Sequence, residues 1–201
     1  MRHLTLLIMT LLALPGCTFY PLTLREAPRP EGWPDLTPVG KIQVKPYPAY
    51  RAAVAAAPNG QATDNTLFRK LFSHISDRDI PMTAPVEMAY GDLEDPGQTD
   101  LEPKAMAFLY RSPSVGQTGA AEPGVQVVDV PASTYVSIGV RGRYTDRRYR
   151  DRVERLLDWL ADDPAGQAYQ QVGPPRYLGY NSPFIPRFMR YAEVQIPVEP
   201  R

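Results

Sequence analysis

The sequence has few of the residues that build reactive or cross-linked sites. Among its 201 residues there is one cysteine, Cys17, and there are two histidines, His3 and His74. A single cysteine excludes an internal disulfide and a multi-thiolate metal site, and two histidines are too few for a histidine-rich metal centre. No nucleophile-elbow glycine pattern is present either. We therefore expect a protein that is not an enzyme.

The chain also lacks an excess of charge of either sign. It contains 22 lysine and arginine residues and 22 aspartate and glutamate residues, which gives a net charge of zero. A neutral chain has no general electrostatic attraction for nucleic acid. Arginines do crowd residues 141–155, but acidic residues interleave with them. We interpret this stretch as a solvated helix face and expect no nucleic-acid partner.

The longest apolar run is too short to cross a membrane as a helix. It extends from Leu4 to Leu14, follows Arg2 and precedes Gly16 and Cys17. This order is typical of a secretory signal, and the position of the only cysteine favours a lipoprotein signal over an ordinary one. We expect residues 1–16 to be removed and Cys17 to carry the lipid. The predicted location is the cell envelope of a Gram-negative bacterium, with a membrane anchor in the outer membrane facing the periplasm.

Residues 17–40 show no apolar period and are rich in proline. Such a composition is typical of an extended, semi-rigid spacer. We predict that this segment is a tether and that the folded domain occupies residues 41–201.

Periodicity within the domain predicts eight strands and two helices. The first helix is expected over residues 66–76, with a buried stripe of Phe68, Leu71, Phe72 and Ile75. The second begins after Thr145, and its stripe contains Tyr149, Val153, Leu156, Leu157 and Leu160. Strands are expected over 42–44, 50–57, 82–90, 104–110, 125–130, 134–142, 175–180 and 191–198.

The order strand, strand, helix, strand, strand occurs twice, with an offset of about 85 to 90 residues along the chain. This repeat indicates duplicated β-α-β-β halves. Two such halves can join their sheets into an antiparallel barrel or saddle with one helix per half packed on it, so the predicted fold class is α+β.

Two proline-punctuated segments stand out, Ile80–Met88 and Tyr180–Val194. Methionine, phenylalanine and proline in such stretches provide apolar surface at little conformational cost. Together with Leu67–Ser76 and with Val125–Gly142, these segments resemble the SOUL haem-binding protein family. The resemblance extends over nearly the whole domain, from Lys41 to Val198.

The resemblance implies a distorted antiparallel eight-stranded barrel with two main helices. It also implies non-covalent binding of haem or another porphyrin in an apolar groove. The groove would lie between the first helix and the loop before the last strand. The residues expected to line it are Leu67, Lys70, Leu71, His74, Phe184, Ile185, Arg187, Phe188 and Met189. Lys70, Arg187 or Arg190 would pair with a propionate. The prolines beside Phe184 and Phe188 favour partial exposure of this loop.

His74 has two interpretations. Imidazole is the commonest protein ligand of haem iron, so His74 is a candidate axial ligand and the candidate metal-binding residue. Alternatively, it is a partly exposed helix residue with no role at the iron. Met82 and Met189 are weaker candidates for the same position.

The function predicted from the sequence is tetrapyrrole binding by an envelope lipoprotein, for transport, buffering or sequestration. Three alternatives stay open: a module for another flat amphipathic ligand, an enzyme acting on tetrapyrroles such as a dechelatase, and a structural lipoprotein without a ligand. The sequence does not identify a protein partner.

Overall fold

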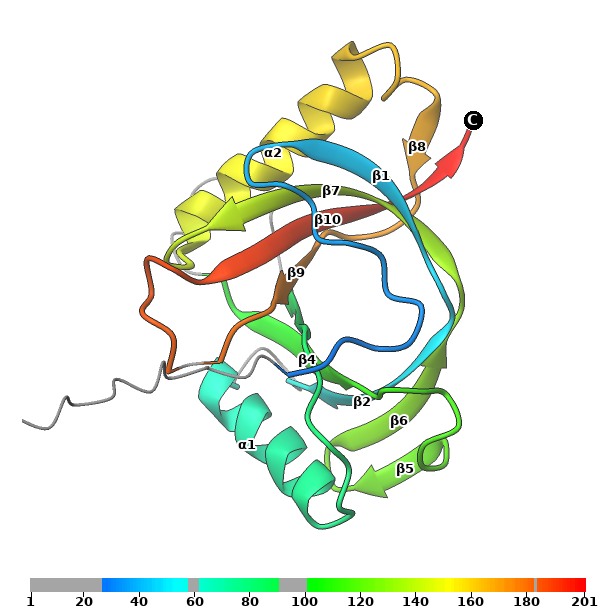
Figure 1. The fold of residues 1–201 in the computed structure, drawn as a ribbon, viewed down its shortest axis with the longest axis vertical. Coiled ribbons are helices and arrows are strands. Elements are labelled where there is room, and N and C mark those ends of the chain that lie inside the picture. The colour runs from blue at the N-terminus through cyan, green and yellow to red at the C-terminus, as the bar shows by residue number, and fades with distance from the viewer. Residues whose placement is uncertain (1–26, 58–61, 91–100, 183) are drawn as a thin grey trace, which may run out of the picture.

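A computed structural model of the chain describes residues 27–57, 62–90, 101–182 and 184–201. Within these residues the chain forms two helices and ten strands (Figure 1). The elements are β1 (Ile42–Tyr47), β2 (Tyr50–Ala56), α1 (Asp64–Ser76), β3 (Val86–Tyr90), β4 (Pro103–Leu109), β5 (Gly119–Glu122), β6 (Val125–Val130), β7 (Ser133–Arg141), α2 (Asp146–Asp162), β8 (Tyr169–Gln171), β9 (Arg176–Gly179) and β10 (Tyr191–Pro200). The predicted signal peptide and Cys17 lie outside the described residues.

The strand order confirms the α+β class and supports the internal duplication. The sheet runs β1-β7-β10-β9-β3-β4-β2-β6-β5, and β8 pairs with β10. The first half of the chain supplies β1, β2, β3 and β4, and the second supplies β6, β7, β9 and β10 in the corresponding places. Without β5 and β8, the order is β1-β7-β10-β9-β3-β4-β2-β6. If each strand is replaced by its counterpart in the other half (β1 by β6, β2 by β7, β3 by β9, β4 by β10, and the reverse), the same order is read backwards. The β3–β9 pair is therefore the centre of an approximate two-fold arrangement.

The expected distorted eight-stranded barrel is, in the structure, a curved sheet of ten strands that is not closed. The sheet curves strongly, but its edge strands β1 and β5 do not pair, so it stays open. The two additional strands are β5 and β8, which have four and three residues. Strands this short carry too few residues for an alternating pattern to be recognised.

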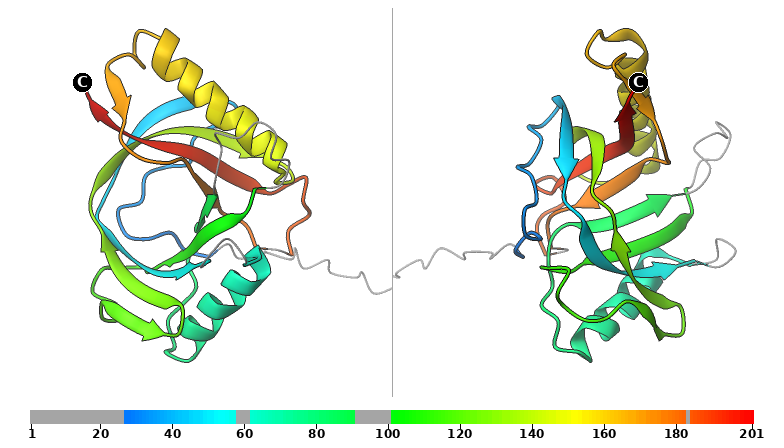
Figure 2. Two further views of the ribbon diagram at one scale, coloured as in Figure 1. Left: turned by 180° about the vertical axis from the view of Figure 1, so that it is seen from behind. Right: turned by 90° about the vertical axis from the view of Figure 1, so that its right-hand side faces the viewer.

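The two faces of the sheet have different partners. Successive side chains of a strand point to opposite faces. In β7 and β10, Val136, Ile138, Val194 and Ile196 pack with α2, while Glu193, Gln195 and Ser137 occupy the other face, within the curve of the sheet. Figure 2 shows both helices on the outer side of the curve. The inner face is thus polar at its centre and aromatic around it.

Both helices begin at a threonine N-cap. Thr63 accepts a hydrogen bond from the Thr66 backbone, and Thr145 accepts one from that of Arg148. Neither helix is long and apolar enough to cross a bilayer, as far as the described residues go. α2 buries most of its predicted stripe, but Leu157 is exposed.

The face of α1 that packs on the sheet differs from the predicted one. The buried residues are Leu67, Leu71, His74 and Ile75, whereas Phe72 is 51% exposed. Apolar doublets at 67–68 and 71–72 give this helix two overlapping stripes, so periodicity alone does not distinguish them. Contact with β2, β4 and β6 selects the stripe that contains Leu67.

The part of the predicted tether that the structure describes is packed into the domain. Trp33 and Thr37 are buried, and in Figure 1 their blue segment lies within the curve of the sheet. Gly139 on β7 allows this approach, because a Cβ there would lie 2.1 Å from the Thr37 carbonyl oxygen. The folded domain therefore begins before Lys41, and the extended-spacer interpretation does not hold for residues 33–37.

Candidate ligand-binding site

The loop between β9 and β10 presents apolar side chains to solvent. Phe184, Phe188 and Met189 are 87%, 75% and 49% exposed. Two turns shape the loop, closed by hydrogen bonds from the Ile185 backbone to Ser182 and from the Met189 backbone to Pro186. The partial exposure expected from the prolines is confirmed for the described residues of this loop.

Arginines hold the loop in this shape. Arg141 Nη1 donates to the Met189 carbonyl at 3.0 Å, and Arg190 Nε donates to that of Ile185 at 2.9 Å. The Arg190 carbonyl accepts from the Gly142 backbone at 2.8 Å. Guanidinium groups thus bond the loop backbone, which leaves the apolar side chains directed outward.

A cavity of about 420 Å³ lies beside the loop. Its walls are formed by the N-terminal segment, the end of β7 and the loop itself; the lining residues are Leu36, Thr37, Pro38, Val39, Arg141, Asn181, Ile185, Met189 and Tyr191. The sequence predicted two of these, Ile185 and Met189. Phe184, Arg187 and Phe188 are on the same loop but do not line the cavity.

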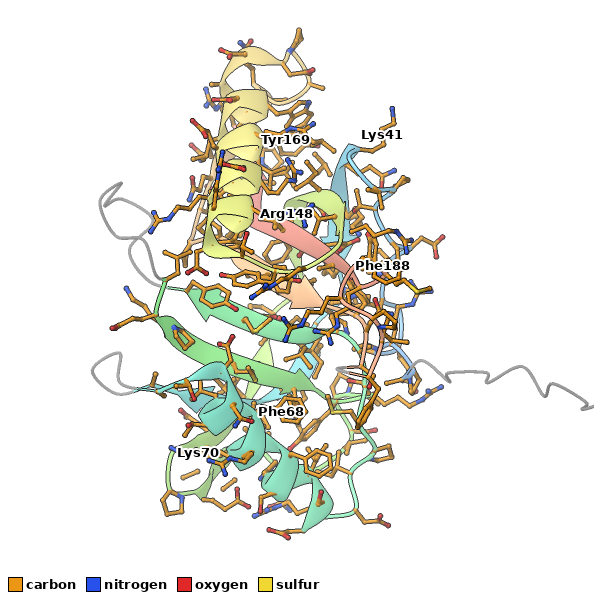
Figure 3. All side chains as sticks on the ribbon, turned by 90° about the vertical axis from the view of Figure 1, so that its left-hand side faces the viewer. Lys41, Phe68, Lys70, Arg148, Tyr169 and Phe188 are labelled. Carbon is orange, nitrogen blue, oxygen red and sulfur yellow. The ribbon has the colours of Figure 1, made fainter. Side chains whose placement is uncertain are left out.

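The predicted α1 wall of the groove is not at this cavity. Leu67 and Leu71 are fully buried beneath the helix. Lys70 lies at the β5–β6 turn, where a Cβ on Gly124 would be 3.2 Å from its Nζ. Figure 3 shows Phe188 well separated from Phe68 and Lys70. Among the described residues, the cavity that the loop lines is shared with residues 36–39 and not with α1.

His74 is not placed to bind iron. It is 1% exposed, its Nε2 is 2.7 Å from the Tyr110 hydroxyl and its Nδ1 is 3.1 Å from a Glu122 carboxylate oxygen. Arg78 pairs with the same carboxylate. Both ring nitrogens are therefore in use. The contact between His74 and Glu122 was not predictable from the sequence, because Glu122 comes from β5, a strand that the sequence pattern does not indicate.

Sequence reasoning also missed a buried carboxylate on the inner face of the sheet. Glu193 is 0% exposed. Its two oxygens accept hydrogen bonds from Lys45, the Thr37 backbone, Tyr47, Tyr180, Tyr191 and Gln195, at 2.6 to 3.2 Å. An acidic residue in the middle of an apolar strand was the sequence signal for such a cluster.

The donors around Glu193 keep it ionised. Burial by itself raises the pKa of this carboxyl, but the charge of Lys45 and the hydrogen bonds from Lys45 and Thr37 outweigh burial. The pKa of Glu193 is therefore below its usual value. A few ångströms away, Arg176 pairs with Glu87 at 2.9 Å and stacks on Tyr135. Trp33 packs edge-on against Tyr47 and Tyr50 and closes this face.

A second cavity of about 420 Å³ lies where the first residues of the two helices approach each other. Its lining includes three carboxylates, Asp64, Glu102 and Asp146. A tetrapyrrole with two propionates is an anion, and carboxylates at close range repel it. Of the two cavities, the one beside the loop has the composition for such a ligand, since its only charged lining residue is Arg141.

Comparison with protein families and solved structures gives one family match. The family described as SOUL heme-binding protein matches residues 36–197. No curated protein matches the chain at a significant level.

Solved structures show where the fold recurs. The EcmrR C-terminal domain is similar with a TM-score of 0.57 and 16% identity, over 80% of this chain and 98% of that one. An uncharacterized conserved protein from Listeria innocua has a TM-score of 0.55 and 10% identity, over 81% of this chain and 94% of that one. In an EcmrR–DNA complex the similarity spans 58% of the EcmrR chain and 80% of this one, with a TM-score of 0.57 and 18% identity. At these identities the likeness concerns the fold alone.

Proposed function

Since the chain belongs to the SOUL haem-binding protein family, we propose that it binds haem or a related tetrapyrrole without a covalent bond, beside the β9–β10 loop. The observation that carries this placement is the cavity that joins residues 36–39 to Ile185 and Met189, bordered by exposed phenylalanines. The proposed role is binding for transport, buffering or sequestration, and not catalysis.

The residues at this position suit a flat ligand that has an apolar macrocycle and two charged propionates. Leu36, Val39, Ile185 and Met189 provide apolar contact. Burying a few hundred Å² of macrocycle at about 25 cal/mol per Å² supplies several kcal/mol before the costs of ordering are subtracted. Arg141 and Arg187 provide guanidinium groups for the propionates. Of the side chains that line the cavity, Met189 alone has a soft atom for iron, so most of the affinity is expected from the macrocycle.

Titration of the protein with haem and with metal-free protoporphyrin tests the proposal. Changing Phe184 and Phe188 together to alanine is expected to weaken haem binding about tenfold or more, because these two exposed rings border the cavity and would cover the part of the macrocycle that extends beyond it. Metal-free protoporphyrin is expected to bind nearly as well as haem. Absorption in the Soret region and quenching of tryptophan fluorescence provide the two readouts.

Two control variants separate this site from the one expected from sequence. Phe72→Ala removes an exposed phenylalanine from α1 and is expected to leave haem affinity unchanged. His74→Gln is expected to lower stability without moving the Soret band. If the Phe184→Ala, Phe188→Ala protein binds haem normally while either control variant loses binding, the site lies on α1 and the proposal is wrong.

We further propose that the protein is anchored in the cell envelope through Cys17. The order of Arg2, an apolar run, Gly16 and Cys17 supports this location. Cys17→Ser is expected to abolish acylation, so that the protein is no longer recovered in the membrane fraction with a lipidated N-terminus. Mass spectrometry of the N-terminal peptide checks the result. An acylated N-terminus in the variant would contradict it.

A further inference from the structure

The β9–β10 loop is part of a larger amphipathic surface. Eight large apolar side chains of the described residues are exposed, and five of them belong to the loop or to the segment beside it: Leu36, Val39, Phe184, Phe188 and Met189. Exposed apolar groups are normal when they are scattered singly, but a group of this size indicates an interaction site. The rest of the described surface has three, Phe72, Leu157 and Val172.

Arginines surround these apolar side chains. A small cleft next to the loop cavity is lined by Arg141, Arg143, Arg148 and Arg152, from the end of β7 and the first turns of α2. Arg141 lines both hollows, so the two are neighbours. The charges of Arg148 and Arg190 both act on the Tyr177 hydroxyl, whose pKa burial raises to about 12. With Arg187, six guanidinium groups lie on or next to the loop.

No acidic side chain among the described residues lines either hollow. Arg148 and Arg152 are one turn apart on α2 and both line the cleft, whereas Asp151 and Glu154 of the same turns do not line it. Asp35, the exposed acid next to Leu36, pairs with Arg29.

The proposed lipid anchor is close in sequence to this surface. Ala27 follows Cys17 by ten positions along the chain, and ten extended residues span at most about 36 Å. The N-terminal segment that continues from Ala27 reaches the loop, because Leu36 and Val39 share a cavity with Ile185 and Met189. Figures 1 and 2 show the start of the described chain on the same side as the loop.

We propose that this surface, consisting of residues 184–190, Leu36, Val39, Arg141, Arg143, Arg148 and Arg152, docks on an anionic lipid bilayer. The arginines pair with lipid phosphates, and the phenylalanines enter the headgroup region, where amphipathic surfaces with aromatic side chains bind. The orientation rests on the proposed anchor at Cys17. It directs the loop cavity towards the membrane, so that an apolar ligand passes between bilayer and protein without crossing water.

Site-specific labelling of the full chain in vesicles tests the docking. Met189→Cys provides a position on the loop, and Asp162→Cys provides an exposed control at the far end of α2. Each variant carries a polarity-sensitive fluorophore and is reconstituted into vesicles of phosphatidylcholine with 30% phosphatidylglycerol and spin-labelled lipids. We expect strong quenching at position 189 and little at position 162, with a decrease at position 189 in pure phosphatidylcholine or in high salt.

A matched pair of charge reversals identifies the role of the arginines. Arg143→Glu is expected to reduce loop quenching, with a fall of about tenfold in vesicle affinity, whereas Arg69→Glu on the exposed side of α1 is expected to change nothing. Equal quenching at positions 189 and 162, or no dependence on anionic lipid, overturns the proposal.

Further arms distinguish docking from acylation and from haem binding. The same labelled variants in a Cys17→Ser chain, mixed with vesicles, report docking without an acyl chain. In the labelled variants that keep Cys17, the fluorophore reacts with residue 17 only if this cysteine has not been acylated. Haem is absent throughout, so a failure of tetrapyrrole binding leaves these results unaffected, and a failure of docking leaves the titrations unaffected.

Discussion

Glu193→Ala is expected to lower the free energy of unfolding by about 3–5 kcal/mol, the largest loss among the single substitutions considered. The change removes the acceptor of six hydrogen bonds and leaves Lys45, itself buried, without its partner. A buried charge whose counter-ion is removed is strongly destabilising, because its desolvation is no longer offset. Chemical denaturation of the two proteins at neutral pH measures the difference.

A control on the same strand separates burial from charge. Glu199→Ala removes a carboxylate that is exposed and accepts one bond from Gln170, so its expected cost is less than about 1 kcal/mol. Similar losses for the two variants would show that Glu193 is not held as the structure describes.

The ionisation of Glu193 also predicts how stability depends on pH. Its folded pKa is below the usual value, so the unfolded state binds the proton more readily. The contribution of Glu193 to stability is therefore complete above the usual glutamate pKa of about 4.3 and is lost as the pH falls through the folded pKa. The difference in stability between the unaltered protein and Glu193→Gln should shrink on acidification through this range. A difference independent of pH would contradict the assignment.

Leu71→Ala is expected to cost about 2–5 kcal/mol, because Leu71 is fully buried against β2, β4 and β6 and its removal leaves a cavity. Phe72→Ala, at the next position, is the matched control. Phe72 is half exposed and mainly stacks on Phe68, so its loss is expected to cost about 1 kcal/mol or less. Denaturation of the two variants under the same conditions compares them.

This pair tests the helix face directly. The sequence pattern places both residues on the buried stripe and predicts comparable losses. The structure turns α1 so that only Leu71 faces the sheet. A larger loss for Phe72→Ala than for Leu71→Ala would restore the face expected from the sequence and would bring the aromatic side chain back into the core.

Much of the architecture was determined by the sequence alone. Alternation in β7 and β10, and the 3.6-residue period in α1 and α2, are local patterns, and each predicted the right type of element. The threonine caps set the helix starts. The repeat of strand, strand, helix, strand, strand indicated two halves, and the strand order supports it. The prolines around Phe184 and Phe188 predicted an exposed loop, because a proline restricts the backbone next to it, which is also a local effect.

Only the tertiary structure decided which surfaces meet. The apolar doublets of α1 permit two faces, and contact with the sheet selects one. Strand β5 has too few residues to be recognised, so the burial of His74 beside Glu122 was not predictable. Residues 33–37 have no period of their own, and the burial of Thr37 depends on Gly139 and Glu193, more than a hundred residues away. Local patterns determine elements, whereas contacts between distant residues decide what the elements cover.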